Sequence, residues 1–263
     1  MPTRQNAYLA VNVRLVALLA LLASDGHLSA QTPQIRISTA TATAWEQSAN
    51  GTPPAARYGQ TAVWTGSEMI VWGGSTGTGG TAYSNTGGRF NPATNSWTAI
   101  TTIGAPAARF GHAIVWTGSE MIVWGGYNDS NGVLNTGGRY NPTTNTWTAL
   151  SSSGAPAARY FPTAVWTGSE MIVWGGSSSS DFNSGGCYNP ATNTWRATTT
   201  SAAPAARHYH TAVWTGSEMI VWGGTPDGII SFNTGGRYNP TNNSWLTTIN
   251  TGTPPERLLH TAV

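Results

Sequence analysis

The chain has 263 residues, of which 8% are charged, and it contains 32 glycines and 13 tryptophans. This composition is typical of turn-rich β structure, and it excludes a coiled coil or a highly charged disordered chain. The twelve basic residues exceed the ten acidic ones by two, and they form no basic run. We therefore expect no nucleic-acid partner. The single cysteine, Cys187, cannot form an internal disulfide.

Residues 1–30 are predicted to be a signal peptide. Arg4 and Arg14 supply positive charge, Leu15–Ala23 is a short apolar core, and Ala30 offers a small residue for cleavage before Gln31. The apolar run is shorter than the ~20 residues that span a bilayer. The mature chain is therefore expected to be secreted or periplasmic, with no membrane span after cleavage. An uncleaved anchor is the alternative.

One sequence pattern recurs four times after the signal. Each copy reads PAAR, then TAVWTGSEMIVWGG, then a variable segment, then GGRYNPTTNTW, with small substitutions. A period of this length with only strand and turn signals indicates a repeat architecture. The repeats are assigned to residues 57–108, 109–158, 159–206 and 207–256, and a partial fifth copy covers 257–263.

All variation in repeat length falls in one segment of each copy. The segment follows the Gly-Gly pair and is 12, 10, 8 and 10 residues long in turn. Steps of two residues let a hairpin lengthen without turning its side chains to the wrong face. The four segments are 75–86, 127–136, 177–184 and 225–234.

Each repeat is predicted to form four antiparallel strands, named a to d. In the first copy these are Thr61–Thr65, Glu68–Trp72, Gly87–Asn91 and Ser96–Ile100. Gly66 suits a tight turn between strands a and b, and an Asn-Pro pair suits a turn between strands c and d. Helical periodicity is absent, so the fold class is all-β.

The Gly-Gly pair, a later aromatic residue and a tryptophan seven residues beyond it recur in the same order four times. In the first copy these are Gly73-Gly74, Phe90 and Trp97. This pattern resembles the kelch repeat, above all that of exported kelch-repeat proteins of bacteria, over about Trp45 to Val263. The resemblance implies a β-propeller of four-stranded antiparallel blades. It also implies that strand a lies near the axis and strand d outside.

The two ends are predicted to carry partial blades. Residues 31–56 include an outer strand d around Trp45, and His260–Val263 begins a strand a. With four complete repeats, the ring is expected to be incomplete. We favour an incomplete sequence of a longer propeller over a five-bladed arc with a broken blade. An open arc would expose strand edges and apolar faces.

The thirteen tryptophans are predicted to fill the space between blades. Each occupies a fixed repeat position on strand a, b or d. A repeat cannot bury its own apolar face alone, so packing between neighbours accounts for them better than ligand stacking does.

A binding site is predicted on the end of the propeller that carries the b–c loops, because binding residues tend to lie on loops held by a rigid scaffold. The alternative is that these are solvent-exposed loops whose sequences have diverged without a binding role. The most distinctive side chains on that face are Tyr127, Asp129, Asp181, Phe182, Asp227, Ile229, Ile230 and Phe232.

One arginine precedes strand a in every repeat, at Arg57, Arg109, Arg159, Arg207 and Arg257. These arginines are candidate anion ligands around the channel mouth, because a guanidinium forks well onto carboxylate or phosphate. Their identical place in every repeat favours a scaffold role, with bonds to link carbonyls and packing on aromatic neighbours.

Strand-c arginines are candidate partners for the glutamates that begin strand b. Arg89, Arg139 and Arg237 have this position, but the third repeat has Cys187 there, which leaves Glu170 without that partner.

Histidines stand three residues after the arginine in three copies, at His112, His210 and His260. Because they come from different blades, they are interpreted as scaffold, and neither a metal site nor a cofactor is predicted.

The sequence favours a noncatalytic binding propeller that recognises a protein or a glycan through its b–c loops. The alternatives are a kelch-type oxidase or sugar-processing enzyme with its active site in missing blades, or a structural surface module. No nucleophile motif is present, and the loop carboxylates form no acid–base pair in the sequence.

Overall fold

The computed structural model describes residues 51–77, 82–249 and 251–262, which form strands and turns. The predicted signal peptide and the predicted strand around Trp45 lie outside the described residues. Four antiparallel sheets of four strands follow one another along the chain. Their strands are β1 (Thr61–Trp64), β2 (Met69–Trp72), β3 (Gly87–Asn91) and β4 (Ser96–Ala99); β5 (Ala113–Trp116), β6 (Met121–Trp124), β9 (Gly137–Asn141) and β10 (Thr146–Ala149); β11 (Thr163–Trp166), β12 (Met171–Trp174), β13 (Gly185–Asn189) and β14 (Thr194–Ala197); β15 (Thr211–Trp214), β16 (Met219–Trp222), β17 (Gly235–Asn239) and β18 (Ser244–Thr247).

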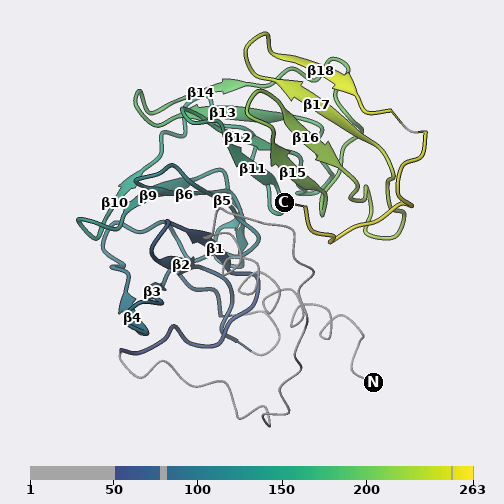
Figure 1. Cartoon of the computed structure of the whole chain (residues 1–263). Helices are drawn as coiled ribbons and strands as arrows, with labels where there is room; N and C mark the ends of the chain where they lie inside the picture. The colour runs from purple at the N-terminus through teal and green to yellow at the C-terminus, as the bar shows by residue number, and fades with distance from the viewer. Residues whose placement is uncertain (1–50, 78–81, 250, 263) are drawn as a thin grey trace, which may run out of the picture.

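The sheets are arranged as propeller blades (Figure 1). The first strand of each sheet (β1, β5, β11 and β15) lies toward the centre, and neighbouring first strands contact one another. The last strands (β4, β10, β14 and β18) lie outside. The predicted all-β fold and blade order are confirmed, and the ring is not closed by the described residues.

The predicted turns have the backbone that their residues favour. Gly66 has φ +100° between β1 and β2, and the Thr65 hydroxyl accepts the Glu68 N–H at 2.9 Å. Asn95 has φ +50° in the turn between β3 and β4, where asparagine tolerates left-handed backbone. The Asn91 side chain accepts the Ala93 N–H at 2.9 Å. All four complete repeats use the same turn residues. The a–b and c–d turns therefore lie at the same end of every blade.

The core lies between blades rather than within them. Trp72, Trp124 and Trp174 on the second strands are fully buried. Each packs on the outer-strand tryptophan of the next blade, with ring centroids 5.2 to 5.4 Å apart. These contacts confirm the predicted packing between blades for the six tryptophans that make them, and Trp64 is an exception. Trp64 is 43% exposed, because no described sheet covers the face of the first blade on which it lies.

The two ends of the propeller are named here after their connections. The turn rim carries the a–b and c–d turns. The loop rim carries the b–c loops (75–86, 127–136, 177–184 and 225–234) and the links from each outer strand to the next inner strand. In the second blade the b–c loop forms a small hairpin of β7 (Tyr127–Asn128) and β8 (Gly132–Val133).

Arginine–glutamate pairs join the strands near the turn rim. The predicted pairs of Arg89 with Glu68, Arg139 with Glu120 and Arg237 with Glu218 are formed at 3.5 to 3.6 Å. The expectation that Glu170 lacks an equivalent partner needs correction. Arg196 stands directly opposite Cys187 on the neighbouring strand and pairs with Glu170 at 2.8 Å.

The partial fifth repeat follows the path of the other links without forming an assigned strand over 257–262. Gly224 N–H donates to the Arg257 carbonyl at 2.9 Å, and Leu259 N–H donates to the Tyr209 carbonyl at 3.0 Å. His260 contacts the Thr211 hydroxyl at 2.9 Å. The prediction of a strand at His260–Val263 is therefore wrong for the described residues 260–262. In the complete blades strand a pairs with a strand b, and no described strand b pairs with these residues.

Candidate functional site

A buried arginine lies beneath the loop rim in each of the last three complete repeats. The side chain of Arg159 is 1% exposed and makes four hydrogen bonds. Its Nε donates to the Ala157 carbonyl, Nη1 donates to the Gly175 and Ser184 carbonyls, and Nη2 donates to the Ser184 hydroxyl, at 2.6 to 3.2 Å. No carboxylate is among these acceptors, so neutral carbonyl and hydroxyl oxygens receive the N–H groups of the buried cation.

The other arginines at this position repeat the arrangement. Arg109 and Arg207 are 0% and 1% exposed, and burial lowers the pKa of these two and of Arg159 to about 10. Arg57 makes the same four bonds while half-buried. These four arginines are candidate ligand-binding residues, and their geometry favours the alternative scaffold interpretation. Their guanidinium groups donate to main-chain carbonyls of the links and loops.

Two further candidates cover these arginines. The Phe182 ring centroid lies 4.1 Å from the Arg159 guanidinium carbon, and the Phe232 centroid lies 4.2 Å from that of Arg207. A cation over an aromatic face is attracted by the ring quadrupole. Phe182 and Phe232 therefore stabilise the buried guanidinium groups, and their rings pack against them.

Above this layer, seven rings form a continuous chain of contacts that we name the aromatic belt. Neighbouring ring centroids are 4.4 to 6.2 Å apart, in stacked, tilted and edge-on arrangements. Such pairs contribute roughly 0.5–1.5 kcal/mol beyond the area they bury. The rings come from two b–c loops and three links, and they are Tyr83, Phe110, Tyr127, Tyr160, Phe161, His208 and Tyr209.

Part of the belt stands on strained backbone. Phe161 and Tyr209 each have φ +54°, whereas the equivalent residues of the first two repeats are Gly59 and Gly111, at +63° and +62°. A bulky side chain in this region costs on the order of 1–3 kcal/mol. A Cβ on Gly111 would also meet the Phe161 ring at 2.9 Å. The third and fourth repeats thus place aromatic rings where glycine would relax the backbone, and the partial fifth has Leu259 there at φ +55°.

Carboxylates flank the belt at two points. Asp129 is exposed, and its Oδ1 accepts hydrogen bonds from the Tyr83 and Tyr127 hydroxyls at 3.2 and 3.1 Å. Burial and Asp129 together raise the pKa of Tyr83 to about 12. Asp181 forms a 2.7 Å contact with His208 Nδ1. The candidates Tyr127 and Asp129 therefore lie in the site, and Asp181 supports its far end.

The fourth b–c loop begins beside the belt. Thr225 pairs with His208 in a β-bridge, and the Asp227 carboxylate accepts the Ile229 and Ile230 N–H groups at 2.8 Å. Those two hydrogen bonds lower the pKa of Asp227. Ile230 is 61% exposed. Asp227 thus shapes the loop, while Ile230 is available to a ligand.

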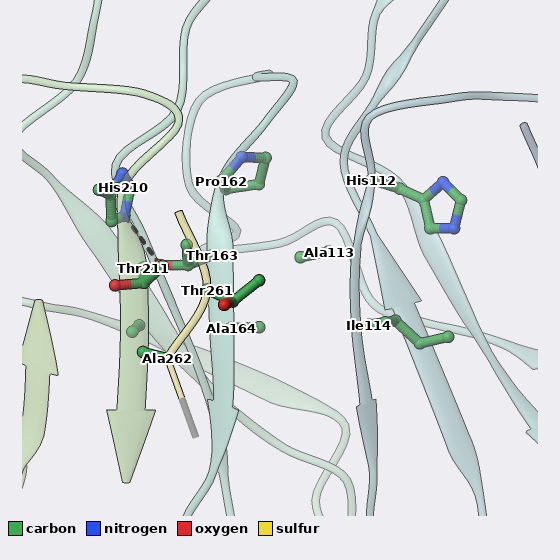
Figure 2. A pocket seen from close by; sticks show the side chains of 11 residues that line it. His112, Ala113, Ile114, Pro162, Thr163, Ala164, His210, Thr211, Thr261 and Ala262 are labelled. Atoms are coloured by element: carbon green, nitrogen blue, oxygen red, sulfur yellow. Dashed lines mark hydrogen bonds between the residues drawn. The ribbon is translucent and has the colours of Figure 1, made fainter. Parts of the chain in front are cut away.

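The central channel carries less chemistry than the loop rim. A cavity of about 340 Å³ is lined mainly by the first residues of β5, β11 and β15 (Figure 2). His210 turns from this wall to the Thr163 hydroxyl at 2.8 Å, as Figure 2 shows, and His112 contacts the Thr61 hydroxyl at 2.6 Å. Each histidine thus joins two adjacent blades. Burial lowers the pKa of both to about 3, so they are neutral near pH 7.

Within the described ranges, no group of three or more His, Cys, Asp or Glu side chains is arranged to hold a metal ion. Those same residues include no helix that is long and apolar enough to cross a bilayer.

The sequence analysis named only Tyr127 among the belt residues and missed the other six, five of them on the links. A signal was present, because the two residues after each repeated arginine differ between copies while their neighbours are nearly constant. These pairs are Tyr58-Gly59, Phe110-Gly111, Tyr160-Phe161, His208-Tyr209 and Leu258-Leu259.

A comparison with family models agrees with the blade geometry. The model described as the KLHDC2/KLHL20/DRC7 Kelch-repeats domain matches residues 59–263, which is most of the chain. No relative was found among curated proteins. The match spans the four sheets, the buried arginines and the aromatic belt. The chain therefore belongs to the Kelch-repeat family.

Proposed function

We propose that this chain is a noncatalytic binding propeller that docks a protein partner on its loop rim through the aromatic belt. Kelch-repeat domains are usually interaction modules without catalytic activity, and this chain shares their fold. The observation that carries the proposal is the belt itself. Seven rings from five separate segments meet on the one rim where the repeats differ in length and sequence.

The chemistry of the belt suits a protein interface. Tyrosine offers a large apolar surface with a polar tip, and aromatic residues are enriched where proteins bind one another. The strained backbone at Phe161 and Tyr209 has a cost that packing alone does not explain, since glycine occupies the same position in other copies. A role of these two rings in ligand binding would account for the strain.

The cysteine and the buried histidines of the described residues support a noncatalytic role. Cys187 lies between blades rather than on the loop rim, and burial raises the pKa of its thiol to about 11. Its sulfur is 3.9 Å from the Tyr238 hydroxyl, in the position that arginine has in the other repeats. The buried histidines are neutral and bonded to threonines.

A glycan is the second candidate ligand. Asp129 stands beside the Tyr83 and Tyr127 rings, and sugars are bound by stacking on aromatic faces with polar groups at the edge. We rank it second because most of the belt lacks such polar flanks.

Peptide display tests the proposal. The full chain is used to select binders from a random peptide library, and an array of neutral oligosaccharides is tested in parallel. We expect selected peptides to lose at least tenfold in affinity for Tyr160→Ser, because that change removes a ring from the middle of the belt. Ser169→Lys, on the turn rim, is the matched control and should change affinity less than twofold.

Thermal unfolding of each variant separates lost binding from lost folding. Peptides that respond to Ser169→Lys but not to Tyr160→Ser would place the binding surface on the wrong rim and overturn the proposal. Oligosaccharide binding that depends on Tyr160, with no peptide binders, would replace the protein ligand by a glycan. A failure of both selections favours a purely structural module.

A further inference from the structure

A pocket of about 260 Å³ opens at one end of the aromatic belt, between the first and second blades. Its walls come from the first b–c loop, the link that follows the first blade, and the hairpin loop of the second blade. One wall is aromatic, three residues present only methyl groups, and one residue is charged. These walls include Ala82, Tyr83, Ala107, Ala108, Asn128 and Asp129.

The walls of this pocket are held in place by hydrogen bonds. Asn128 is 4% exposed, and its side-chain amide donates to the Ala108 carbonyl while its oxygen accepts the Asn131 N–H at 2.7 Å. The pairing of β7 with β8 fixes the same loop. A wall that is ordered before binding reduces the entropy lost on association.

The charge of the pocket is negative. Asp129 is its only ionisable carboxylate, and its described partners are the neutral hydroxyls of Tyr83 and Tyr127, both on Oδ1. None of the ion pairs among the described residues includes Asp129. The nearby arginine of the link, Arg109, directs its guanidinium into the interior at Gly125 and Thr136. A cationic group is therefore the matching ligand.

The aromatic wall selects among cations. Tyr83 stacks on Phe110 with an angle of 22° between the rings, and Tyr127 contacts both edge-on. A planar guanidinium can lie on an aromatic face while its N–H groups reach a carboxylate, whereas an ammonium is a point charge without a stacking face. The methyl groups of Ala82, Ala107 and Ala108 suit the apolar stem of such a side chain.

We propose that the pocket between Tyr83 and Asp129 binds an arginine side chain of the protein partner. The arginine stem lies along the alanines, its guanidinium stacks at Tyr83, and its N–H groups donate to the Asp129 carboxylate. This inference rests on the proposed function, because it names the residue by which the partner anchors at the loop rim.

Short blocked peptides test the pocket with the full chain. Ac-GGRGG-NH2, Ac-GGKGG-NH2 and Ac-GGQGG-NH2 are titrated and followed by NMR, with maltose as a neutral sugar probe. We expect saturable binding of the arginine peptide, several-fold weaker binding of the lysine peptide, and none of the glutamine peptide. Asp129→Asn should weaken the arginine peptide at least fivefold, and 0.5 M salt should weaken it as well.

Asp227→Asn is the matched control, since it removes an exposed aspartate on the same rim but outside the pocket. It should leave arginine binding within twofold of the parent chain. Equal binding of the arginine and glutamine peptides, or no effect of Asp129→Asn, would overturn the inference. So would maltose that competes for the pocket and is insensitive to salt.

Selected library peptides separate this inference from the proposed function. In one outcome, the selected peptides require Tyr160, contain no arginine and bind the Asp129→Asn variant as tightly as the parent chain. That result would overturn the arginine pocket and retain the proposed binding rim. Selected peptides whose affinity is unchanged by Tyr160→Ser would overturn the proposed function, whether or not the short arginine peptide binds.

Discussion

The two rims of the propeller each use arginines, and they use them differently. Beneath the loop rim, Arg159 is buried and is surrounded by carbonyl oxygens and the Phe182 ring. At the turn rim, Arg139 is partly exposed, pairs with Glu120 at 3.5 Å and donates to the Pro190 carbonyl of the next blade at 2.8 Å. The same residue type thus supports a loop scaffold at one end and ties adjacent blades at the other.

This difference explains where the repeats can vary. At the loop rim, the arginine bonds to main-chain carbonyls, which every residue possesses, so loop side chains can change without loss of support. At the turn rim, the contacts use particular side chains, such as the glutamate and the turn asparagine, and those residues recur in every copy. A rim supported through its backbone is free to carry a binding surface.

The largest expected effect comes from removing a buried arginine at the loop rim. Arg159→Met keeps the apolar stem but leaves the Ala157, Gly175 and Ser184 carbonyls without their donor. We expect the free energy of unfolding to fall by about 3–5 kcal/mol, measured by denaturant titration. Arg57→Met is the matched control, because Arg57 makes the same four bonds while half-buried and water can replace it. Equal losses in the two variants would show that burial is not what separates them.

Acid should destabilise the fold through its two fully buried histidines, His112 and His210. The pKa of His112 and His210 is lowered to about 3 by burial, whereas an unfolded histidine has a pKa near 6.5. The unfolded state therefore binds more protons below pH 6.5, so stability present above that pH is lost as the pH falls toward 3. The expected slope is roughly 1.4 kcal/mol per pH unit for each histidine.

The free energy of unfolding measured between pH 6.5 and 4.5 checks this effect, since over that range both histidines bind protons in the unfolded state but not in the folded state. His210→Gln should reduce the slope by about 1.4 kcal/mol per pH unit, because one titrating group is removed. An unchanged slope would mean that His210 takes up its proton in the folded state without cost.

The sequence was sufficient for the blades and insufficient for the belt. Repeated turn residues such as Gly66 and Asn95 act locally, so strand order and turn backbone follow from neighbouring residues. The contact between Tyr127 and Tyr160 depends on how one blade packs on the next, which no local pattern encodes. The b–c loops could therefore be identified from the repeat lengths, while the link residues that pack beside them were overlooked.

The partner of Glu170 illustrates a relation that the pattern did contain. In the third repeat, arginine is missing from strand c at Cys187 but appears at Arg196, where the other copies have threonine or leucine. The two positions are directly opposite in an antiparallel pair. In this repeat the arginine therefore stands on strand d instead of strand c. Only a register prediction between strands c and d would have found it.

The smallest expected effect compares two turn-rim arginines. Arg196 pairs with Glu170 and also donates to the Pro240 carbonyl of the next blade at 3.2 Å, whereas the Arg237 side chain is 44% exposed and faces no described blade. Arg196→Gln should lower the free energy of unfolding by about 1–2 kcal/mol, since a cross-blade tie is lost, and Arg237→Gln by less than about 0.5 kcal/mol. Both follow from denaturant titration of the full chain. A loss for Arg237→Gln as large as that for Arg196→Gln would show that the glutamate pair, and not the tie between blades, carries the stability of this rim.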